Sequence, residues 1–200
     1  MANTTPTNYQ KHQTTNRIQR FLIDRFNRRL IEYIHLCGNV RNILDVGCGE
    51  GFSLSFIQNS GVTAKLAGVD ASAESLALGK KEFPHLNLQR GDIYALSAKS
   101  KSYDLVLCTE VLEHLENPDK AIEELKRVSR NYVIVSVPDE PWFMIANFLR
   151  GKYLSRWGNH PEHINHWSRQ GIVDLLTSHG YEIFRCANPF AWTIILARVA

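Results

Sequence analysis

The sequence lacks the features that mark several large classes of protein. Over 200 residues no apolar run approaches the ~20 residues that a membrane-spanning helix needs, and the densest apolar stretch, residues 142–149, includes Asn147. The first fifteen residues are polar and have no apolar centre, so we expect no secretory signal peptide. Hydrophobic residues at 44% and charged residues at 22% are ordinary for a globular domain, which argues against general disorder.

Cysteine is scarce and the net charge is small. The four cysteines are widely spaced and form no CxxC pair, which argues against a disulfide framework and a structural zinc site. We therefore expect reduced thiols and a cytoplasmic protein. A net charge of +3 is too small to indicate nucleic-acid binding by itself. The composition predicts one soluble domain, residues 16–200, after a mobile polar tail, residues 1–15.

Alternating strand and helix signals predict the fold class. Residues 16–36 have the periodicity of an amphipathic helix, with Ile18 on the same side as Phe26 and Leu30, and Asn27 on the opposite, charged side. Short apolar runs and helical stretches then alternate, which is typical of a doubly wound α/β fold whose parallel sheet has helices on both faces. The predicted strands are 43–46, 66–69, 86–89, 105–108 and 132–137, and the predicted helices are 53–59, 73–83, 119–128 and 169–178.

Two regions depart from this alternation. The extended patterns at 181–186 and 191–199 are joined by only four residues, too few for a parallel crossover, so these strands must pair antiparallel. The connection at 93–101 is too short for us to expect a regular helix. Residues 138–167 are rich in aromatic residues, proline, glycine and histidine, and we expect them to form a small lid insertion.

A glycine-rich loop follows the first predicted strand. Residues 43–51 read Ile-Leu-Asp-Val-Gly-Cys-Gly-Glu-Gly, and Gly47 and Gly49 allow a ligand to approach the backbone closely. A dinucleotide site would need a helix N-terminus free of anions, but this loop carries Asp45 and Glu50. These acids favour a ligand that lacks phosphate and is cationic near the loop, such as S-adenosylmethionine.

Two more acids stand at the ends of the next two strands. Asp70 lies about 20 residues beyond the glycine loop, where a carboxylate can accept both ribose hydroxyls. Asp92 follows the third strand, where it can bind an adenine amino group while Ile93 packs against the ring. Each acid alone is equally well explained as a turn or helix-cap residue. Three acids at the carboxyl ends of three strands together favour a ligand site.

The motifs of residues 40–199 resemble those of class I S-adenosylmethionine-dependent methyltransferases: LDVGCGEG, GVD, GDI and LCTEVLEHL, in this order. The resemblance implies a Rossmann-like, seven-stranded sheet with an antiparallel last strand. It also implies SN2 transfer of a methyl group from the sulfonium sulfur to a nucleophile. By this resemblance, Asp45 and the loop glycines hold the methionine part of the cofactor. The full set of implied cofactor-binding residues is Asp45, Gly47, Gly49, Asp70, Ala71, Asp92, Ile93 and Thr109.

An acid–histidine cluster follows the fourth predicted strand. If this stretch is helical, Glu110, Glu113 and His114 lie on one face. They would then serve as ligands of a divalent ion, or as a base and the acid that orients it. A simple capping turn is the alternative, because glutamate is favourable in a first helical turn. The lid region adds a second histidine-rich stretch, residues 159–169, which includes His163.

The arrangement ExxEH followed by HxxH resembles two families of O-methyltransferase, those that act on the 3′ ends of small RNAs and those of the ubiquinone pathway. By this resemblance, Mg²⁺ or Mn²⁺ would be held by Glu110, Glu113, His114 and His163. A metal would chelate neighbouring acceptor oxygens and lower the pKa of one. A metal-free mechanism with His114 or His163 as general base is an alternative, and so is transfer by proximity alone.

The apolar lid region bears on the acceptor. Residues 141–149 favour a small or lipid-like acceptor, and the basic residues that follow would suit peripheral contact with a membrane. The arginines of residues 16–36 are best explained as a solvated face, with contact to lipid phosphates or RNA as the alternative. RNA binding usually needs a further platform domain, so we expect O-methylation of a small or lipophilic acceptor. The alternatives are an RNA ribose 2′-O-methyltransferase, a dinucleotide-dependent oxidoreductase and a cofactor-binding module without catalysis.

Overall fold

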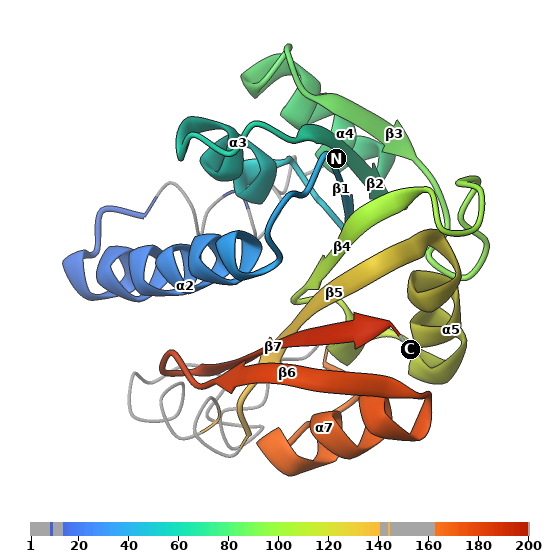
Figure 1. Ribbon diagram of the computed structural model, residues 1–200. Helices are drawn as coiled ribbons and strands as arrows, with labels where there is room; N and C mark the ends of the chain where they lie inside the picture. The colour runs from blue at the N-terminus through green and yellow to red at the C-terminus, as the bar shows by residue number, and fades with distance from the viewer. Residues whose placement is uncertain (1–8, 10–13, 141–143, 145–162, 200) are drawn as a thin grey trace.

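The computed structural model describes residues 9, 14–140, 144 and 163–199. Most of the expected tail and most of the expected lid lie outside these residues. One seven-stranded sheet runs through the molecule in the order β3-β2-β1-β4-β5-β7-β6 (Figure 1). Within the described part of the chain, no helix has the length and apolar character needed to cross a membrane.

The strands are β1 (Asn42–Val46), β2 (Lys65–Asp70), β3 (Asn87–Arg90), β4 (Tyr103–Thr109), β5 (Ser129–Pro138), β6 (Tyr181–Ala187) and β7 (Trp192–Val199). The helices are α2 (Arg17–Leu36), α3 (Phe52–Asn59), α4 (Ala73–Glu82), α5 (Pro118–Val128) and α7 (Arg169–Ser178), and η1 (Leu112–His114) is a single 3-10 turn. The strand predicted at 86–89 lies one residue later because Leu86 still belongs to the preceding turn, where its N–H donates to the carbonyl of Phe83 (3.0 Å). Residues 91–102 connect β3 to β4 through turns, without a helix.

The predicted doubly wound topology is confirmed. Strands β1 to β5 are parallel, and β7 is antiparallel to both of its neighbours, β5 and β6. From β1 the chain builds outward first to β2 and β3 and later to β4 and β5. The order therefore reverses between β1 and β4, and in open α/β sheets ligands bind at the carboxyl ends of the strands at such a point.

The central strands are buried on both faces. Side chains alternate along each strand, so Ile43 and Leu107 pack beneath α2 and α3, whereas Leu44 and Val106 pack against α5 and α7. All four side chains are buried. Burial on both sides is why these strands read as nearly continuous apolar runs in the sequence.

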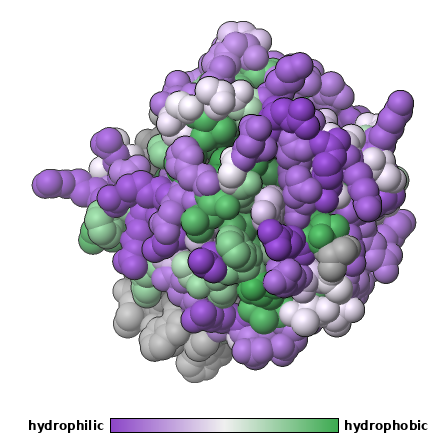
Figure 2. Space-filling model, in the orientation of Figure 1, coloured by the Kyte–Doolittle hydropathy of each residue, from purple (hydrophilic) through white to green (hydrophobic). Residues whose placement is uncertain are grey.

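Helix α2 begins where Asn16 caps it, since the Asn16 side-chain oxygen accepts hydrogen bonds from the N–H groups of Ile18 and Gln19 (2.9 and 3.1 Å). Its predicted buried face is wrong at two positions: Ile18 is 72% exposed and Asn27 only 7% exposed. The first turns of α2 extend beyond the sheet (Figure 1), whereas Asn27 lies one turn from both Ile23 and Leu30, in the middle of the packed face. Hydrophobic residues form a band between α2 and strands β6 and β7, so α2 covers only part of this face (Figure 2).

Candidate functional site

The loop between β1 and α3 has a backbone that requires glycine. Gly47, Gly49 and Gly51 all have positive φ angles (79°, 53° and 88°). A Cβ atom at Gly47 would lie only 2.3 Å from Cγ2 of Val111. The Gly47 N–H donates to the carbonyl of Val69 (2.8 Å), which ties the loop to the end of β2. The loop therefore forms a cradle that any side chain at Gly47 would fill.

Asp45 lies beneath this cradle and is almost completely buried, with 1% of its surface exposed. Burial, and secondly the neighbouring carboxylate of Asp70, raises the pKa of Asp45 to about 7. No described residue hydrogen-bonds its Oδ1 atom. A buried carboxylate oxygen without a partner suits a cationic group bound in the loop, which agrees with the charge argument from the sequence.

Asp70 is oriented by two backbone groups. The Gly49 N–H donates to its Oδ2 (2.7 Å) and the Ser72 N–H donates to its Oδ1 (2.8 Å). Each carboxylate oxygen can accept a further hydrogen bond, so the two oxygens of Asp70 can still accept hydrogen bonds from two vicinal hydroxyls. The same carboxylate thus ties the glycine loop to the end of β2, and Ala71 follows it on the surface.

Asp92 forms a turn, which was the alternative role expected for this residue from the sequence. Its Oδ1 accepts a hydrogen bond from the N–H of Tyr94 (2.9 Å), which is an Asx turn. The side chain is exposed and no described residue hydrogen-bonds Oδ2, so turn formation and ligand binding are compatible. Ile93 packs partly against the core beside β2 and so is held next to Asp92.

The helix expected over Glu110, Glu113 and His114 does not form. Glu110 has a φ of 60° and its N–H donates to the carbonyl of Ser136 (3.1 Å), so it continues the pairing of β4 with β5. Only residues 112–114 then make a 3-10 turn. The Glu110 carboxylate instead accepts hydrogen bonds from Nε1 of Trp192 and from Oγ of Ser136 (3.4 Å). These bonds engage the Glu110 carboxylate, and Glu110 is not part of the group that the other three residues predicted to bind a metal form among the described residues.

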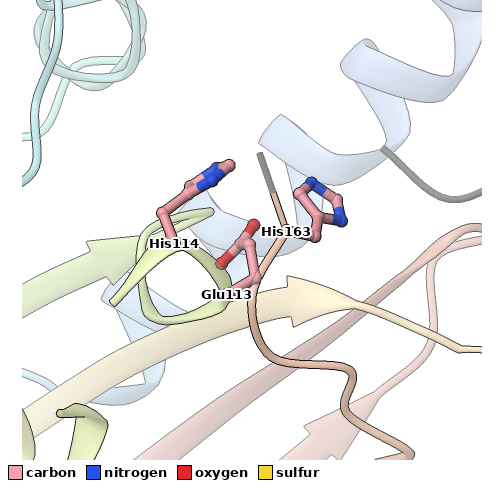
Figure 3. Close-up of side chains that lie close together, drawn as sticks. All are labelled: Glu113, His114 and His163. Carbon is pink, nitrogen blue, oxygen red and sulfur yellow. The ribbon is translucent and has the colours of Figure 1, made fainter. Parts of the chain in front are cut away.

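Glu113, His114 and His163 do come together. One possible ligand atom from each lies within 4.8 Å of the others, and Figure 3 shows the Glu113 carboxylate to one side of the two imidazole rings, close to both. The ring centroids of His114 and His163 are 5.1 Å apart. Glu113 is buried (1% exposed) and His114 is exposed, so the cluster reaches from the interior to the surface.

Asn165, which sequence reasoning missed, fastens His163 to this position. Its side-chain Nδ2 donates to the carbonyls of Leu112 (3.1 Å) and Leu115 (2.6 Å). The backbone carbonyl of Glu113 in turn accepts the N–H groups of Ile164 and Asn165 (2.8 and 3.0 Å). The only signal in the sequence was the position of Asn165 between two histidines.

Glu140 holds the other end of the segment formed by residues 163–168. It follows β5, and its N–H donates to the carbonyl of Trp167 (3.1 Å). Burial raises the pKa of the Glu140 carboxyl. The Met144 N–H and His166 lower this pKa by a smaller amount. Nδ1 of His166 lies 3.7 Å from Oε1 of Glu140. Ser168 then caps α7, where its Oγ accepts the Gly171 N–H (3.1 Å). Residues 163–168 are thus held at both ends.

The cradle and the cluster adjoin. Val111 lies against Gly47, and the His114 N–H donates to the carbonyl of Val111 (3.0 Å). Thr109 is the last residue of β4, two residues before Val111, and is half-buried. A cationic ligand in the cradle would therefore lie close to two imidazoles and a buried carboxylate. Together these three groups can accept a proton or hold a divalent ion.

Residues 13–185 match the family model of a methyltransferase domain. A ubiquinone biosynthesis O-methyltransferase of Coxiella burnetii is 31% identical over 170 residues, covering 75% of this chain and 70% of the relative. A probable S-adenosylmethionine-dependent methyltransferase of Mycolicibacterium smegmatis is 26% identical over 163 residues; the match covers 79% of this chain but only 59% of that relative. The magnesium protoporphyrin IX methyltransferase of Synechocystis, solved with bound S-adenosylhomocysteine, shares the fold with a TM-score of 0.71 and 20% identity, covering 97% of this chain and 95% of that one.

Proposed function

Because this chain belongs to the class I S-adenosylmethionine-dependent methyltransferases, we propose that it methylates an oxygen atom of a small or lipophilic acceptor. The observation that carries the proposal is the cluster of Glu113, His114 and His163 beside the glycine loop. The ubiquinone biosynthesis O-methyltransferases among its relatives support oxygen as the accepting atom.

Residues at and just after the carboxyl ends of β1, β2 and β3 would hold the cofactor, which supplies an electrophilic methyl group on a sulfonium sulfur. The cradle at Gly47 and Gly49 accommodates the methionine part, and Asp45 below it favours the ammonium group. Asp70, already aligned by two backbone N–H groups, receives the ribose hydroxyls. The free oxygen of Asp92 accepts the adenine amino group.

The cluster after β4 would activate the acceptor. An imidazole nitrogen of His114 or His163 removes the proton of the acceptor hydroxyl as the new oxygen–carbon bond forms and the carbon–sulfur bond breaks. The Glu113 carboxylate lies beside both rings and stabilises the imidazolium that results. Holding the hydroxyl in line with the methyl group supplies much of the remaining acceleration.

A metal-assisted version uses the same three side chains. One carboxylate and two imidazoles form a donor set that suits Mn²⁺ better than Mg²⁺, which prefers oxygen ligands. A bound ion would lower the pKa of an acceptor hydroxyl and orient it. Glu110, turned toward Trp192 and Ser136, would have to leave its hydrogen bonds to join such a site.

The test begins with calorimetric titration of S-adenosylhomocysteine into the protein, because failure to bind would overturn the cofactor assignment. The loaded protein is then titrated with Mn²⁺ and Mg²⁺, in parallel with Glu113→Gln. Saturable Mn²⁺ binding that the variant loses would support the metal-assisted version. Cofactor binding without metal binding would favour the metal-free mechanism, with a histidine as general base.

Methyl transfer is then measured with catechols, vicinal diols and lipid phenols as acceptors. His163→Ala should lower turnover at least tenfold, and His35→Ala, which removes an exposed histidine at the end of α2, should not. Full activity in His163→Ala and in His114→Ala would contradict the histidine base. An intact cofactor site without turnover of any acceptor class would favour the non-catalytic module.

A further inference from the structure

A basic hollow lies between α2 and the turn that joins β6 to β7. Its volume is about 410 Å³. Helix α2 contributes Arg25, Arg28 and Arg29, and the turn contributes Asn188 and Pro189. The three arginines are spaced i, i+3 and i+4, which places their side chains on one face of the helix.

The positive charge of the hollow is only partly neutralised. Three arginines against Glu32 leave a net charge of +2 on its lining. Glu32 pairs with Arg29 (2.7 Å), whereas Arg25 and Arg28 make no ion pair with any described carboxylate. Among the described residues, Arg28 donates only to a backbone carbonyl, that of Asp24 (3.4 Å). Like charges one turn apart destabilise a helix, so a bound anion would relieve this repulsion.

The hollow adjoins the acceptor side of the proposed active site. Asn188, in its wall, donates to Asp139 at the end of β5 (2.6 Å). Trp192, just beyond the turn, packs against Phe26 of α2 with ring centroids 5.6 Å apart, and its Nε1 donates to Glu110 at the end of β4. One side chain therefore spans the distance between the arginine helix and the strand end that carries the catalytic cluster.

We infer that this hollow binds an acidic group of the methyl acceptor, a phosphate, a diphosphate or paired carboxylates. The inference rests on the proposed function and narrows its substrate class to acceptors that carry such a group. Guanidinium groups bind these anions through paired N–H donors, and those of Arg25 and Arg28 form no ion pair with a carboxylate in the part of the chain that the structure describes. Phe21 and Pro189, which also line the hollow, would contact the carbon skeleton next to the acidic group.

The experiment titrates inorganic pyrophosphate into the full chain loaded with S-adenosylhomocysteine, by calorimetry at moderate salt. We expect saturable binding with one site per chain. The double variant Arg25→Gln/Arg28→Gln should weaken it at least tenfold, since it removes two charge-assisted contacts. The matched control Arg17→Gln/Arg20→Gln removes the same charge from exposed positions of the same helix, outside the hollow, and should change affinity less than threefold.

The outcomes separate this inference from the proposed function. Normal binding of S-adenosylhomocysteine without saturable binding of pyrophosphate would overturn the inference and leave the cofactor site intact. Equal weakening in both double variants would overturn it as well, because general charge attraction would then explain the binding. A second arm uses vesicles of phosphatidylcholine with and without phosphatidylglycerol. Binding to the anionic vesicles through Arg25 and Arg28, without pyrophosphate binding, would overturn the inference. The hollow would then be assigned to a lipid headgroup and not to an acidic group of the acceptor.

Discussion

The proposed site has a cofactor half and an acceptor half, and their contacts span very different distances along the chain. In the cofactor half, Asp70 contacts Ser72, its neighbour but one, and Gly49, 21 residues away. In the acceptor half, Asn165 contacts Leu115 across 50 residues, and Trp192 contacts Glu110 across 82. The first half depends on backbone conformation within short motifs, and the second on side chains that the fold brings together. The first is therefore visible in the sequence, and damage to each half should have a separate signature.

The largest effect should come from Gly47→Ala. The new Cβ would meet Val111 at 2.3 Å on a backbone with φ of 79°. We expect about 2–4 kcal/mol lower stability, combining overpacking with left-handed strain, and no measurable binding of S-adenosylhomocysteine. Gly61→Ala is the matched control: its φ is 85°, but no atom lies within 4 Å of the added Cβ, so it should cost about 1 kcal/mol. Denaturant unfolding and calorimetry measure both, and equal costs in the two variants would show that Val111 does not matter.

Asp70→Ala should weaken cofactor binding without removing it. The variant leaves the ribose hydroxyls unpaired and releases the N–H groups of Gly49 and Ser72. We expect a loss of about 1–3 kcal/mol in the binding free energy of S-adenosylhomocysteine, measured by calorimetry. Asp119→Ala, an exposed acid in the first turn of α5, serves as a control for loss of charge. Unchanged affinity in Asp70→Ala would mean that the cofactor lies elsewhere.

Asn165→Ala tests the acceptor half alone. It removes the hydrogen bonds to the carbonyls of Leu112 and Leu115, and so loosens the segment that holds His163. Because small misplacement of a catalytic group is costly, we expect turnover to fall about tenfold while affinity for S-adenosylhomocysteine stays the same. Gln170→Ala, which loses only an exposed bond to Asp174, is the control. A parallel loss of cofactor affinity in Asn165→Ala would argue against two separable halves.

The smallest effect concerns pH and Asp45. Its pKa is raised from 3.8 to about 7 in the folded protein, so between these values the folded state holds a proton that the unfolded chain has lost. The ligand-free protein therefore loses stability as pH rises through this interval. A cationic cofactor favours the ionised carboxylate, so its binding should release this proton.

Affinity for S-adenosylhomocysteine should accordingly rise about fivefold from pH 6 to pH 7 and less than twofold from pH 7 to pH 8. Calorimetry in buffers of different ionisation enthalpy counts the protons released. Asp45→Asn should abolish both the slope and the proton release. A slope of the same size in the variant would assign the titration to another group.

The same contrast explains what the sequence could predict. The local structure of the proposed cofactor half follows from local rules: a strand, a glycine loop with positive φ, and acids at strand ends that also serve as turn residues, as Asp92 does. The topology follows from alternating patterns and from the short link before β7. Those rules fail at Glu110, because its N–H pairs with Ser136 on the neighbouring strand, and local helical spacing carries no information about that pairing.

Long-range packing also decided the positions that sequence reasoning missed. Ile18 fits an amphipathic pattern, yet its turn of α2 lies beyond the sheet. Asn165 and the basic hollow each combine residues from distant parts of the chain, and no spacing rule links α2 with the turn before β7. These features became visible only when the tertiary contacts were known.

The position of β7 has a consequence for how the molecule acquires its shape. Strand β7 lies between β5 and β6, so β5 and β6 never pair with each other, and Pro138 is matched with Trp192. During synthesis, one edge of β5 cannot pair until β7 has been made, more than 50 residues later. Contacts of such long sequence separation slow folding. Because Trp192 begins that strand, the contact between Trp192 and Glu110 beside the proposed catalytic cluster forms only when the last strand of the sheet is inserted.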